Sequence, residues 1–220
     1  MTSIHSVALE VDDPKAAEAF YADAFDLGPR LALRPSQAQT TGFRGFTLSL
    51  VVSGPATVDE LIGGAIDAGA TPLKPVRKSF WGYGGVVRAP DGTIWKVATS
   101  SKKDAVPATR QIDEIVLLLG VADVVASKRF FVDHGLEVAR SFGRKYVQFA
   151  GEDFTLALYG RRALAKDAGV SPDGAGAHRI IIRGDAGTFT DPDGFAWKAD
   201  RPQDGATDIT TGSHAVSQMT

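Results

Sequence analysis

The sequence predicts an α+β fold made of repeated units, in which a strand, a helix and further strands follow one another. The first observation behind this prediction is that residues 4–28, near the N-terminus, share their pattern with residues 112–138. The second is that the segment PDGTIWKVA at 90–98 recurs as PDGFAWKAD at 192–200. Internal similarity at corresponding places in the two halves indicates a duplicated fold.

Each opening segment predicts a strand, a turn at an aspartate and a short helix. Counted from Asp13 and Asp123, an aromatic pair follows seven and eight residues later in both segments, Phe20–Tyr21 and Phe130–Phe131. An aspartate is a good helix N-cap, because its carboxylate accepts hydrogen bonds from the free backbone N–H groups of the first turn. Helical spacing then places the phenylalanine of each segment on a stripe that faces a sheet.

The later segments of each half predict strands that follow tight turns. Strand FTLSLVV at 46–52 resembles FTLALYG at 154–160, and each PDG turn has Pro and Gly where a β-turn favours them. An amphipathic helix is expected at 58–70. After residues 177–183 the chain leaves no room for a matching helix, so the last unit is expected to be shortened. The charged segment at 161–169 is expected to be a helical connection with a solvated face.

The repeat predicts where the chain divides. We expect a first half with two units at residues 1–100 and a second half with a shortened last unit at 111–200. The segment 101–110 between the two halves contains Pro107 and is expected to be a linker. The segment 201–220 has little apolar periodicity and is expected to be a C-terminal tail.

The composition excludes several classes of function. The 220 residues carry a formal net charge of -2, without a basic run interleaved with aromatic residues, so nucleic acid is not an expected partner. No apolar run approaches the roughly 20 residues that a membrane-spanning helix needs, and the N-terminus lacks the pattern of a signal peptide. The absence of cysteine excludes disulfides and thiolate metal sites. We therefore expect a cytoplasmic protein without a membrane partner.

Taken together, the strand–Asp–helix segments with their aromatic pairs and the closing PDG strands resemble the vicinal oxygen chelate superfamily. This group includes glyoxalase I, the extradiol dioxygenases and the bleomycin-resistance proteins. The resemblance extends from the N-terminus to about residue 200. It implies tandem βαβββ modules whose cupped mixed sheets give a glyoxalase-like fold, in a chain that is a monomer or a homodimer.

The resemblance also implies where a metal would be bound. Enzymes of this group hold a divalent metal with His and Glu side chains from the first and last strands of each module. The matching first-strand position of the first module is Ser6, whereas strand alternation sends His5 to the opposite face. The two closing strands carry Lys96 and Lys198 in place of the glutamate. A protonated lysine has no lone pair to give, so we expect no bound metal and no other cofactor.

The remaining positions implied by the resemblance are also poor metal ligands. The second module offers Thr47 or Ser49, and the last module offers His178. The first strand of the second half offers Val116, or Glu114 if a bulge shifts the register. A single histidine among such residues cannot supply the three or four ligands of a zinc, iron or nickel site.

Two charged side chains are candidates for chemistry in the cup of the first half. Strand alternation places Glu10 on the face of Ser6, and Lys96 is expected to point into the same cup. Glu10 could then act as a base or substrate anchor while Lys96 binds an anion. A structural ion pair between Glu10 and Lys96 that fills the place of a metal is the simpler interpretation.

We therefore expect a metal-free protein that binds a small aromatic or amphipathic molecule in the first-half cup, as the antibiotic-sequestering resistance proteins do. The alternative is a glyoxalase-like lyase or isomerase that uses Glu10 and Lys96 in place of a metal site. The aromatic, Gly-rich segment SFWGYGG at 79–85 is expected to lie at the mouth of the cup. The predicted ligand-binding residues are Ser6, Thr47, Ser49, Trp81, Tyr83, Arg44, His178 and Lys198.

Overall fold

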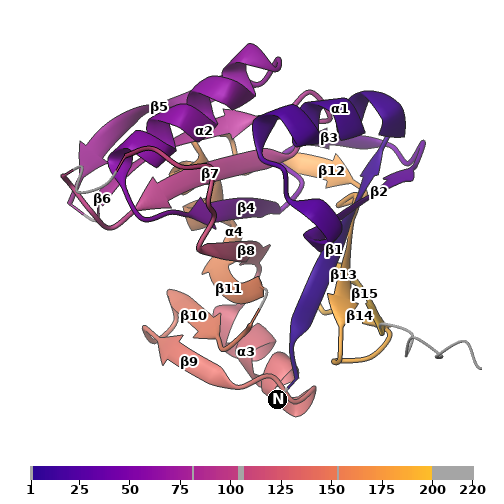
Figure 1. Cartoon of the computed structure of the whole chain (residues 1–220). Helices are drawn as coiled ribbons and strands as arrows, with labels where there is room; N and C mark the ends of the chain where they lie inside the picture. The colour runs from indigo at the N-terminus through magenta and orange to yellow at the C-terminus, as the bar shows by residue number, and fades with distance from the viewer. Residues whose placement is uncertain (1, 81, 104–106, 153, 200–220) are drawn as a thin grey trace, which may run out of the picture.

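The predicted α+β fold is confirmed by a computed structural model, which describes residues 2–80, 82–103, 107–152 and 154–199. The described strands form one mixed sheet of 13 strands and a separate two-stranded ribbon, and four α-helices pack against the sheet (Figure 1). None of these helices has the length and apolar character needed to cross a bilayer. Trp81 and the expected tail at 201–220 lie outside the described residues.

The elements follow one another as the repeat predicts. The first half contains β1 (Ile4–Val11), α1 (Pro14–Ala24), the 3-10 turn η1 (Gly28–Arg30), β2 (Leu31–Pro35), β3 (Thr40–Gly42), β4 (Phe46–Val51), α2 (Pro55–Asp67), β5 (Thr71–Ser79), β6 (Gly82–Arg88) and β7 (Ile94–Thr99). The second half contains β8 (Glu114–Val121), α3 (Val124–Asp133), β9 (Val138–Ser141), β10 (Tyr146–Phe149), β11 (Phe154–Gly160), α4 (Arg161–Ala168), β12 (Gly174–Gly176), β13 (Ile180–Gly184), β14 (Phe189–Thr190) and β15 (Ala196–Ala199).

Two complete strand–helix–three-strand units lie in the middle of the chain. They are β4-α2-β5-β6-β7 and β8-α3-β9-β10-β11, whereas no helix lies between β13 and β15, so the last unit is shortened as expected. The predicted helix caps are present. The carboxylate of Asp13 accepts from the N–H groups of Lys15 and Ala16, and that of Asp123 accepts from Val125 and Ala126. These bonds hold the pKa of Asp123 below its ordinary value.

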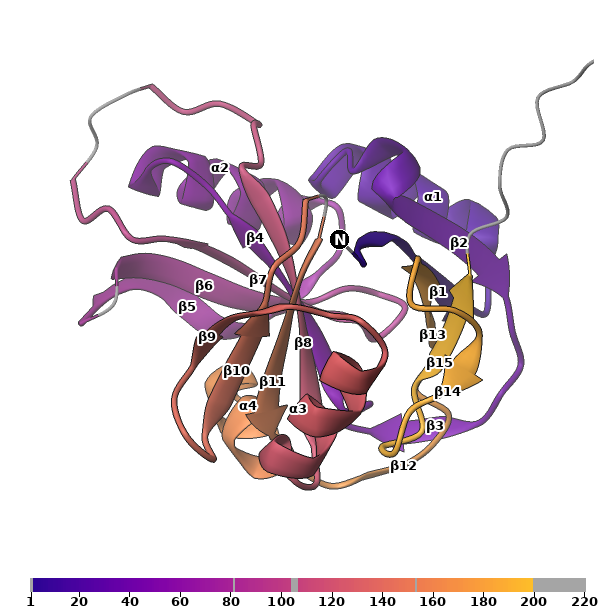
Figure 2. The same ribbon diagram turned by 90° about the horizontal axis from the view of Figure 1, so that it is seen from below.

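Strand pairing crosses the boundary between the two halves of the sequence. β4 pairs antiparallel with β8, and β1 pairs antiparallel with β13. The sheet therefore consists of an eight-stranded array in the order β5-β6-β7-β4-β8-β11-β10-β9 and a five-stranded array in the order β2-β1-β13-β15-β14. The arrays join where Ile4 of β1 meets Phe154 of β11, and Figure 2 shows the two diverging from this line. The residue boundaries of the two halves remain a prediction about the repeat.

The helices pack on the tryptophan side of the strands. α1 and α2 lie side by side on the sheet (Figure 1), and the ring of Trp95 lies 5.6 Å from that of Tyr21 on α1. In the second half, Trp197 lies 5.1 Å from Phe131 on α3. Both tryptophans are almost fully buried in one core cluster with residues of both halves. The duplicated Trp therefore fixes the helix layer, as its place in the repeat predicts.

The two PDG turns are tied to this helix layer by their aspartates. Asp91 accepts from the hydroxyl of Tyr21 at 2.8 Å, and Asp193 accepts from the hydroxyl of Ser127 at 3.0 Å. The second turn has an additional buried carboxylate, Asp191, which accepts from the indole N–H of Trp197 and from two backbone N–H groups. Burial raises the pKa of Asp191 above its ordinary value, although these hydrogen bonds oppose the rise.

Helix α4 packs on the face of the eight-stranded array that the other helices leave open. Its residues Leu164, Ala165 and Ala168 are buried against Leu118 and Ala157. The predicted helical connection with a solvated charged face is present, since Arg162 and Lys166 are exposed, but the buried opposite face was not predicted. The buried face follows from the sequence, because the apolar residues recur at helical spacing between the charged residues and form a narrow buried stripe.

We predict that Asp191→Asn lowers the free energy of unfolding by about 1–3 kcal/mol, because the amide nitrogen would face the indole N–H of Trp197, donor against donor. A raised native pKa means that the native state binds its proton more tightly, so the Asp191 contribution to stability falls as pH rises through that pKa. In Asp191→Asn, the free energy of unfolding should lose the part of its pH dependence that comes from this carboxyl. Urea unfolding at several pH values measures both effects, with the exposed Asp133→Asn as the control. Equal stability of the two variants would contradict the prediction.

Candidate functional site

The first and last strands of the two complete units lie together at the centre of the eight-stranded array, in the order β7-β4-β8-β11. One row of paired residues crosses these strands: Lys96 pairs with Ser49, Ser49 with Val116, and Val116 with Thr155. Paired residues on neighbouring strands point to the same side of a sheet, so these four side chains share one face, which we call the Lys96 face. Thr47 lies two residues before Ser49 on β4, so its side chain points to this face as well.

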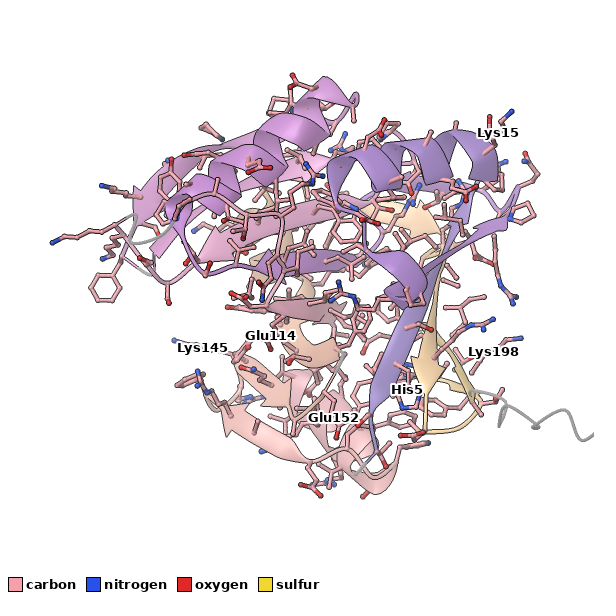
Figure 3. All side chains as sticks on the ribbon, in the orientation of Figure 1. His5, Lys15, Glu114, Lys145, Glu152 and Lys198 are labelled. Carbon is pink, nitrogen blue, oxygen red and sulfur yellow. The ribbon has the colours of Figure 1, made fainter. Side chains whose placement is uncertain are left out.

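A shorter row crosses the five-stranded array. Ser6 of β1 pairs with Arg183 of β13, and Arg183 pairs with Lys198 of β15. Arg183, rather than His178, therefore occupies the first-strand position of the last unit. His178 lies before β13, and its two ring nitrogens face the backbone oxygens of Arg44 and Asp193. Lys198 is exposed at the outer side of this array (Figure 3).

These rows do not fit the metal site that the resemblance implies. On the Lys96 face the four positions supply an ammonium, two hydroxyls and an apolar side chain. The matching row of the other array supplies a hydroxyl and two cations. Within the described part of the chain, no group of three or more His, Asp or Glu side chains is placed to hold a metal ion. A cation beside cations is electrostatically unfavourable, and hydroxyls alone are weak ligands for zinc, iron or nickel.

Lys96 is instead paired with a carboxylate from helix α4. Its Nζ lies 2.9 Å from Oδ2 of Asp167, and both side chains remain more than one third exposed. Lys74 of β5 reaches the same end of the helix, where its Nζ donates to the backbone oxygens of Lys166 and Asp167 at 2.8 and 2.6 Å. The C-terminal end of α4, where the helix dipole is negative, is thus held by two lysines.

A cleft of about 220 Å³, which we call the Lys96 cleft, opens beside this ion pair. Apart from Asp167, its lining comes from β5, β6 and β7 of the first half. Its lining contains three cationic side chains, those of Lys74, Arg77 and Lys96, and one carboxylate, that of Asp167. Gly84 forms part of its wall and has no room for a side chain, because a Cβ there would lie 2.7 Å from the backbone oxygen of Val97. The cleft is therefore a shallow, net positive site with a close-packed backbone wall.

Polar side chains continue on the Lys96 face beyond this cleft. Glu114 lies on it, two residues before Val116, and accepts a hydrogen bond from the hydroxyl of Thr155. Val116 holds the first-strand position, so the alternative register that would place Glu114 there was wrong: β8 pairs with β4 and β11 without a bulge. Burial raises the pKa of Tyr146 to about 12, helped by Tyr159 and by the negative charge of Glu114. Burial also raises the pKa of Tyr159, and the charge of Asp167 adds to this effect. Both tyrosines therefore remain neutral hydrogen-bond donors at physiological pH.

The structure does not bring Glu10 and Lys96 together. Glu10 lies on β1 in the five-stranded array, beside Arg34 of β2, and three strands separate β1 from β7 in the sheet. Among the described ion pairs Lys96 is joined to Asp167 and not to Glu10. The expected Glu10–Lys96 pair was wrong because both strands were assigned to one cup, whereas pairing across the halves sends them to different arrays.

The aromatic and basic residues expected at the cup mouth are also separated. Tyr83 lines the Lys96 cleft, but its hydroxyl donates to Asp59 of α2 at 2.9 Å, on the helix-covered side of the sheet. Arg44 lies just before β4, and its Nη2 donates to the backbone oxygen of Asp91. Of the two, only Tyr83 therefore borders the Lys96 cleft, and Arg44 belongs to a separate part of the surface.

Three residues of the site were missed from the sequence. Asp167 was not considered because helix α4 was assigned to a solvated connection. Thr155 and Arg183 were missed because strand register decides which residue stands opposite Ser49 or Ser6, and register follows from pairing rather than from local pattern. Successive residues of a strand point to opposite faces, so in FTLALYG the side chain of Thr155 lies on the face opposite to Phe154 and Leu156. This alternation is the signal in the sequence that indicates the face of Thr155.

We predict that Asp167→Asn changes the free energy of unfolding by less than about 1 kcal/mol, because the Lys96–Asp167 pair is partly exposed and screened by water. The carbonyl of residue 167, which accepts from Lys74, is retained in this variant. Urea unfolding at low and high salt measures the effect, and the small difference from the wild type should vanish at high salt. A loss of several kcal/mol, or a loss that does not depend on salt, would contradict this description of the pair.

Comparison with known proteins gives similarity in structure only. No family model matches the sequence. No curated protein matches it either. Glyoxalase I of Zea mays is 14% identical, with a TM-score of 0.57 over 90% of this chain and 92% of that chain. A proposed dioxygenase of Bacillus subtilis is 15% identical, with a TM-score of 0.52 over 82% of this chain and 69% of that chain.

A glyoxalase/bleomycin resistance protein/dioxygenase family enzyme of Burkholderia phytofirmans covers a shorter part, 44% of this chain at 19% identity with a TM-score of 0.37. At the identities of the two longer matches, the similarity establishes the fold. It covers both arrays, because the maize enzyme is matched over nearly the whole of each chain. The protein therefore has a glyoxalase-like fold, with Ser49, Lys96, Val116 and Thr155 on the central strands where the resemblance implies metal ligands.

Proposed function

We propose that this protein binds a small anionic molecule, aromatic or amphipathic in its remaining part, in the Lys96 cleft and without a metal ion. The observation that carries the proposal is the cationic lining of this cleft, where Lys74, Arg77 and Lys96 lie with the carboxylate of Asp167. Ammonium and guanidinium groups bind carboxylate or phosphate oxygens by charge-assisted hydrogen bonds. The row Lys96–Ser49–Val116–Thr155 supports the metal-free part of the proposal, because one cation, two hydroxyls and an apolar side chain do not form a transition-metal site.

The charge of the Lys96 cleft supports an anionic ligand. Lys74, Lys96 and Arg77 face the cleft, and two of these cations are already turned to the negative end of α4. The Asp167 carboxylate supports an anion site beside Lys96, since it lies at hydrogen-bond distance from this side chain. An incoming ligand would share or replace this contact. The exposed fraction of both partners keeps the energetic barrier to such an exchange low.

The uncharged walls of the cleft favour a ligand whose remaining part is apolar. Val86, Ala98 and Pro75 line it together with glycine backbone, which leaves flat apolar surface beside the cations. An aromatic ring or a short aliphatic chain can lie on such a surface while its acidic group faces Lys96. The cleft is small and open, so the proposed ligand is correspondingly small.

The alternative function, a lyase or isomerase that uses Glu10 with Lys96, needs both side chains in one site. The two residues lie on different arrays, so no observation favours that pair as catalytic acid and base. Binding requires only groups that already line the Lys96 cleft.

Zinc, nickel or manganese added in equimolar amount to EDTA-treated protein should leave the melting temperature unchanged. The physical reason is that a ligand raises the melting temperature only if it binds the native state, and the two rows offer no metal-binding donor set. Differential scanning calorimetry checks this, with elemental analysis of the purified protein beside it. One bound transition metal per chain, with a melting shift reversed by chelator, would disprove the metal-free site.

We predict that Lys96→Met weakens the binding of phenyl phosphate by about tenfold or more, because one charge-assisted hydrogen bond contributes about 1.5–3 kcal/mol. Lys198→Met is the matched control, since it removes the lysine at the same place in the repeat from the other array. Isothermal titration calorimetry measures both affinities. Equal loss in the two variants, or no measurable binding to wild-type protein in a wider panel of aromatic acids, would contradict the proposed site.

A further inference from the structure

A register shift in the edge strand β5 brings a second cation to the Lys96 face. β5, β6 and β7 lie side by side (Figure 1), and Lys74 of β5 pairs with Val86, which in turn pairs with Lys96. Three residues after Lys74, Arg77 pairs with Gly84, which is only two residues from Val86. In a regular strand, residues three apart point to opposite faces. The extra residue in β5 therefore turns Arg77 to the same face as Lys74.

Small residues leave a floor between Arg77 and Lys96. Gly84 and Ala98 continue the row of Arg77 across β6 and β7, and both line the Lys96 cleft. Strands β5 and β7 are two strand spacings apart, which is about 10 Å. The side chains of Arg77 and Lys96 thus begin on opposite sides of this floor, and a small group that lies on it can contact both.

The three cations of the cleft differ in what already holds them. Lys74 donates to two backbone oxygens at the end of α4, and Lys96 forms the ion pair with the Asp167 carboxylate. Arg77 is exposed, and within the described part of the chain no hydrogen bond or ion pair holds its guanidinium. Arg77 is therefore the cation that an external ligand can contact without displacing a group of the protein.

A ligand with a single negative charge gains little at Lys96. The Asp167 carboxylate already lies 2.9 Å from Nζ of Lys96 and belongs to the same chain, so a monoanion in its place exchanges one such contact for another. A group with two negative charges gains more, because it can contact Lys96 and Arg77 together. The lining also favours a dianion, since its three cations exceed its single carboxylate by two charges.

We propose that the ligand of the Lys96 cleft is a dianion of the phosphate monoester class, which displaces the Asp167 carboxylate and joins Lys96 to Arg77. This inference rests on the proposed function of the cleft as an anion site. Arg77 then determines the specificity, because its planar guanidinium can donate to two oxygens of one phosphate. The end of α4 keeps its place during the exchange, since Lys74 holds it through backbone oxygens.

Phenyl phosphate and phenyl sulfate test this charge preference, because they share the ring and the tetrahedral oxygens, but at about pH 8 only the phosphate is a dianion. The wild-type protein should bind phenyl phosphate at least about tenfold more tightly, since the dianion makes one more charge-assisted contact. Arg77→Gln should weaken phenyl phosphate binding about tenfold and phenyl sulfate binding less than about threefold. Isothermal titration calorimetry measures these affinities.

Lys78→Gln is the matched control, because Lys78 is the exposed neighbour of Arg77 on β5 and points to the opposite face. It removes the same charge and should preserve the preference for phenyl phosphate. Asp167→Asn should strengthen the binding of both anions about twofold to fivefold, because Lys96 then has no carboxylate to exchange. Unchanged affinities in Asp167→Asn would contradict the displacement of Asp167.

Equal affinity of the wild type for the two anions, with both lost in Lys96→Met, would overturn the dianion and leave the anion site of the proposed function in place. A preference for phenyl phosphate that persists in Arg77→Gln, or that Lys78→Gln reduces equally, would overturn the role of Arg77. An absence of binding of either anion to the wild type would overturn this inference together with the proposed function.

Discussion

The antiparallel pairing of β4 with β8 is the contact on which the rest of the structure depends. It joins the two complete units edge to edge, so that β7, β4, β8 and β11 become neighbours and Lys96, Ser49, Val116 and Thr155 form one row. It also leaves β1 to pair with β13 in a second array. As a consequence both halves contribute to each of the two buried core clusters, and sheet hydrogen bonds join distant parts of the sequence.

Helix α4 decides what kind of site this arrangement can offer. Its stripe of Leu164, Ala165 and Ala168 covers the middle of the Lys96 face, which would otherwise leave Leu118 and Ala157 in contact with water. The charged end of the helix then falls beside Lys96, where Asp167 forms the ion pair. The polar positions that remain accessible lie around this helix end. A large buried cup is therefore replaced by clefts at the edges of α4, each with more basic than acidic side chains.

The two closing strands show how a duplicated sequence gains different roles. Trp95 and Trp197 are both buried against a helix of their own half, so this part of the repeat is kept by packing. The lysines that follow them differ, because Lys96 lies among β4, α4 and its partner Asp167, whereas Lys198 is exposed beside Arg183. The same residue at the same place in the repeat can thus contribute to a cleft in one array and lie exposed beside another basic residue in the other.

The features that could be predicted from the amino-acid sequence arise from local interactions. The caps at Asp13 and Asp123, the buried face of each Trp-Lys strand and the missing helix of the last unit all follow from contacts between residues close in the chain, which is why pattern and turn chemistry predict them. Glu10, His178 and Asp167 were placed or overlooked incorrectly because their surroundings come from strands and a helix far away in sequence. The pairing of the strands, their register and the face that α4 covers could be seen only in the folded chain. Backbone hydrogen bonds between strands are the same for every sequence, so burial of the whole core selects among the compatible partner strands.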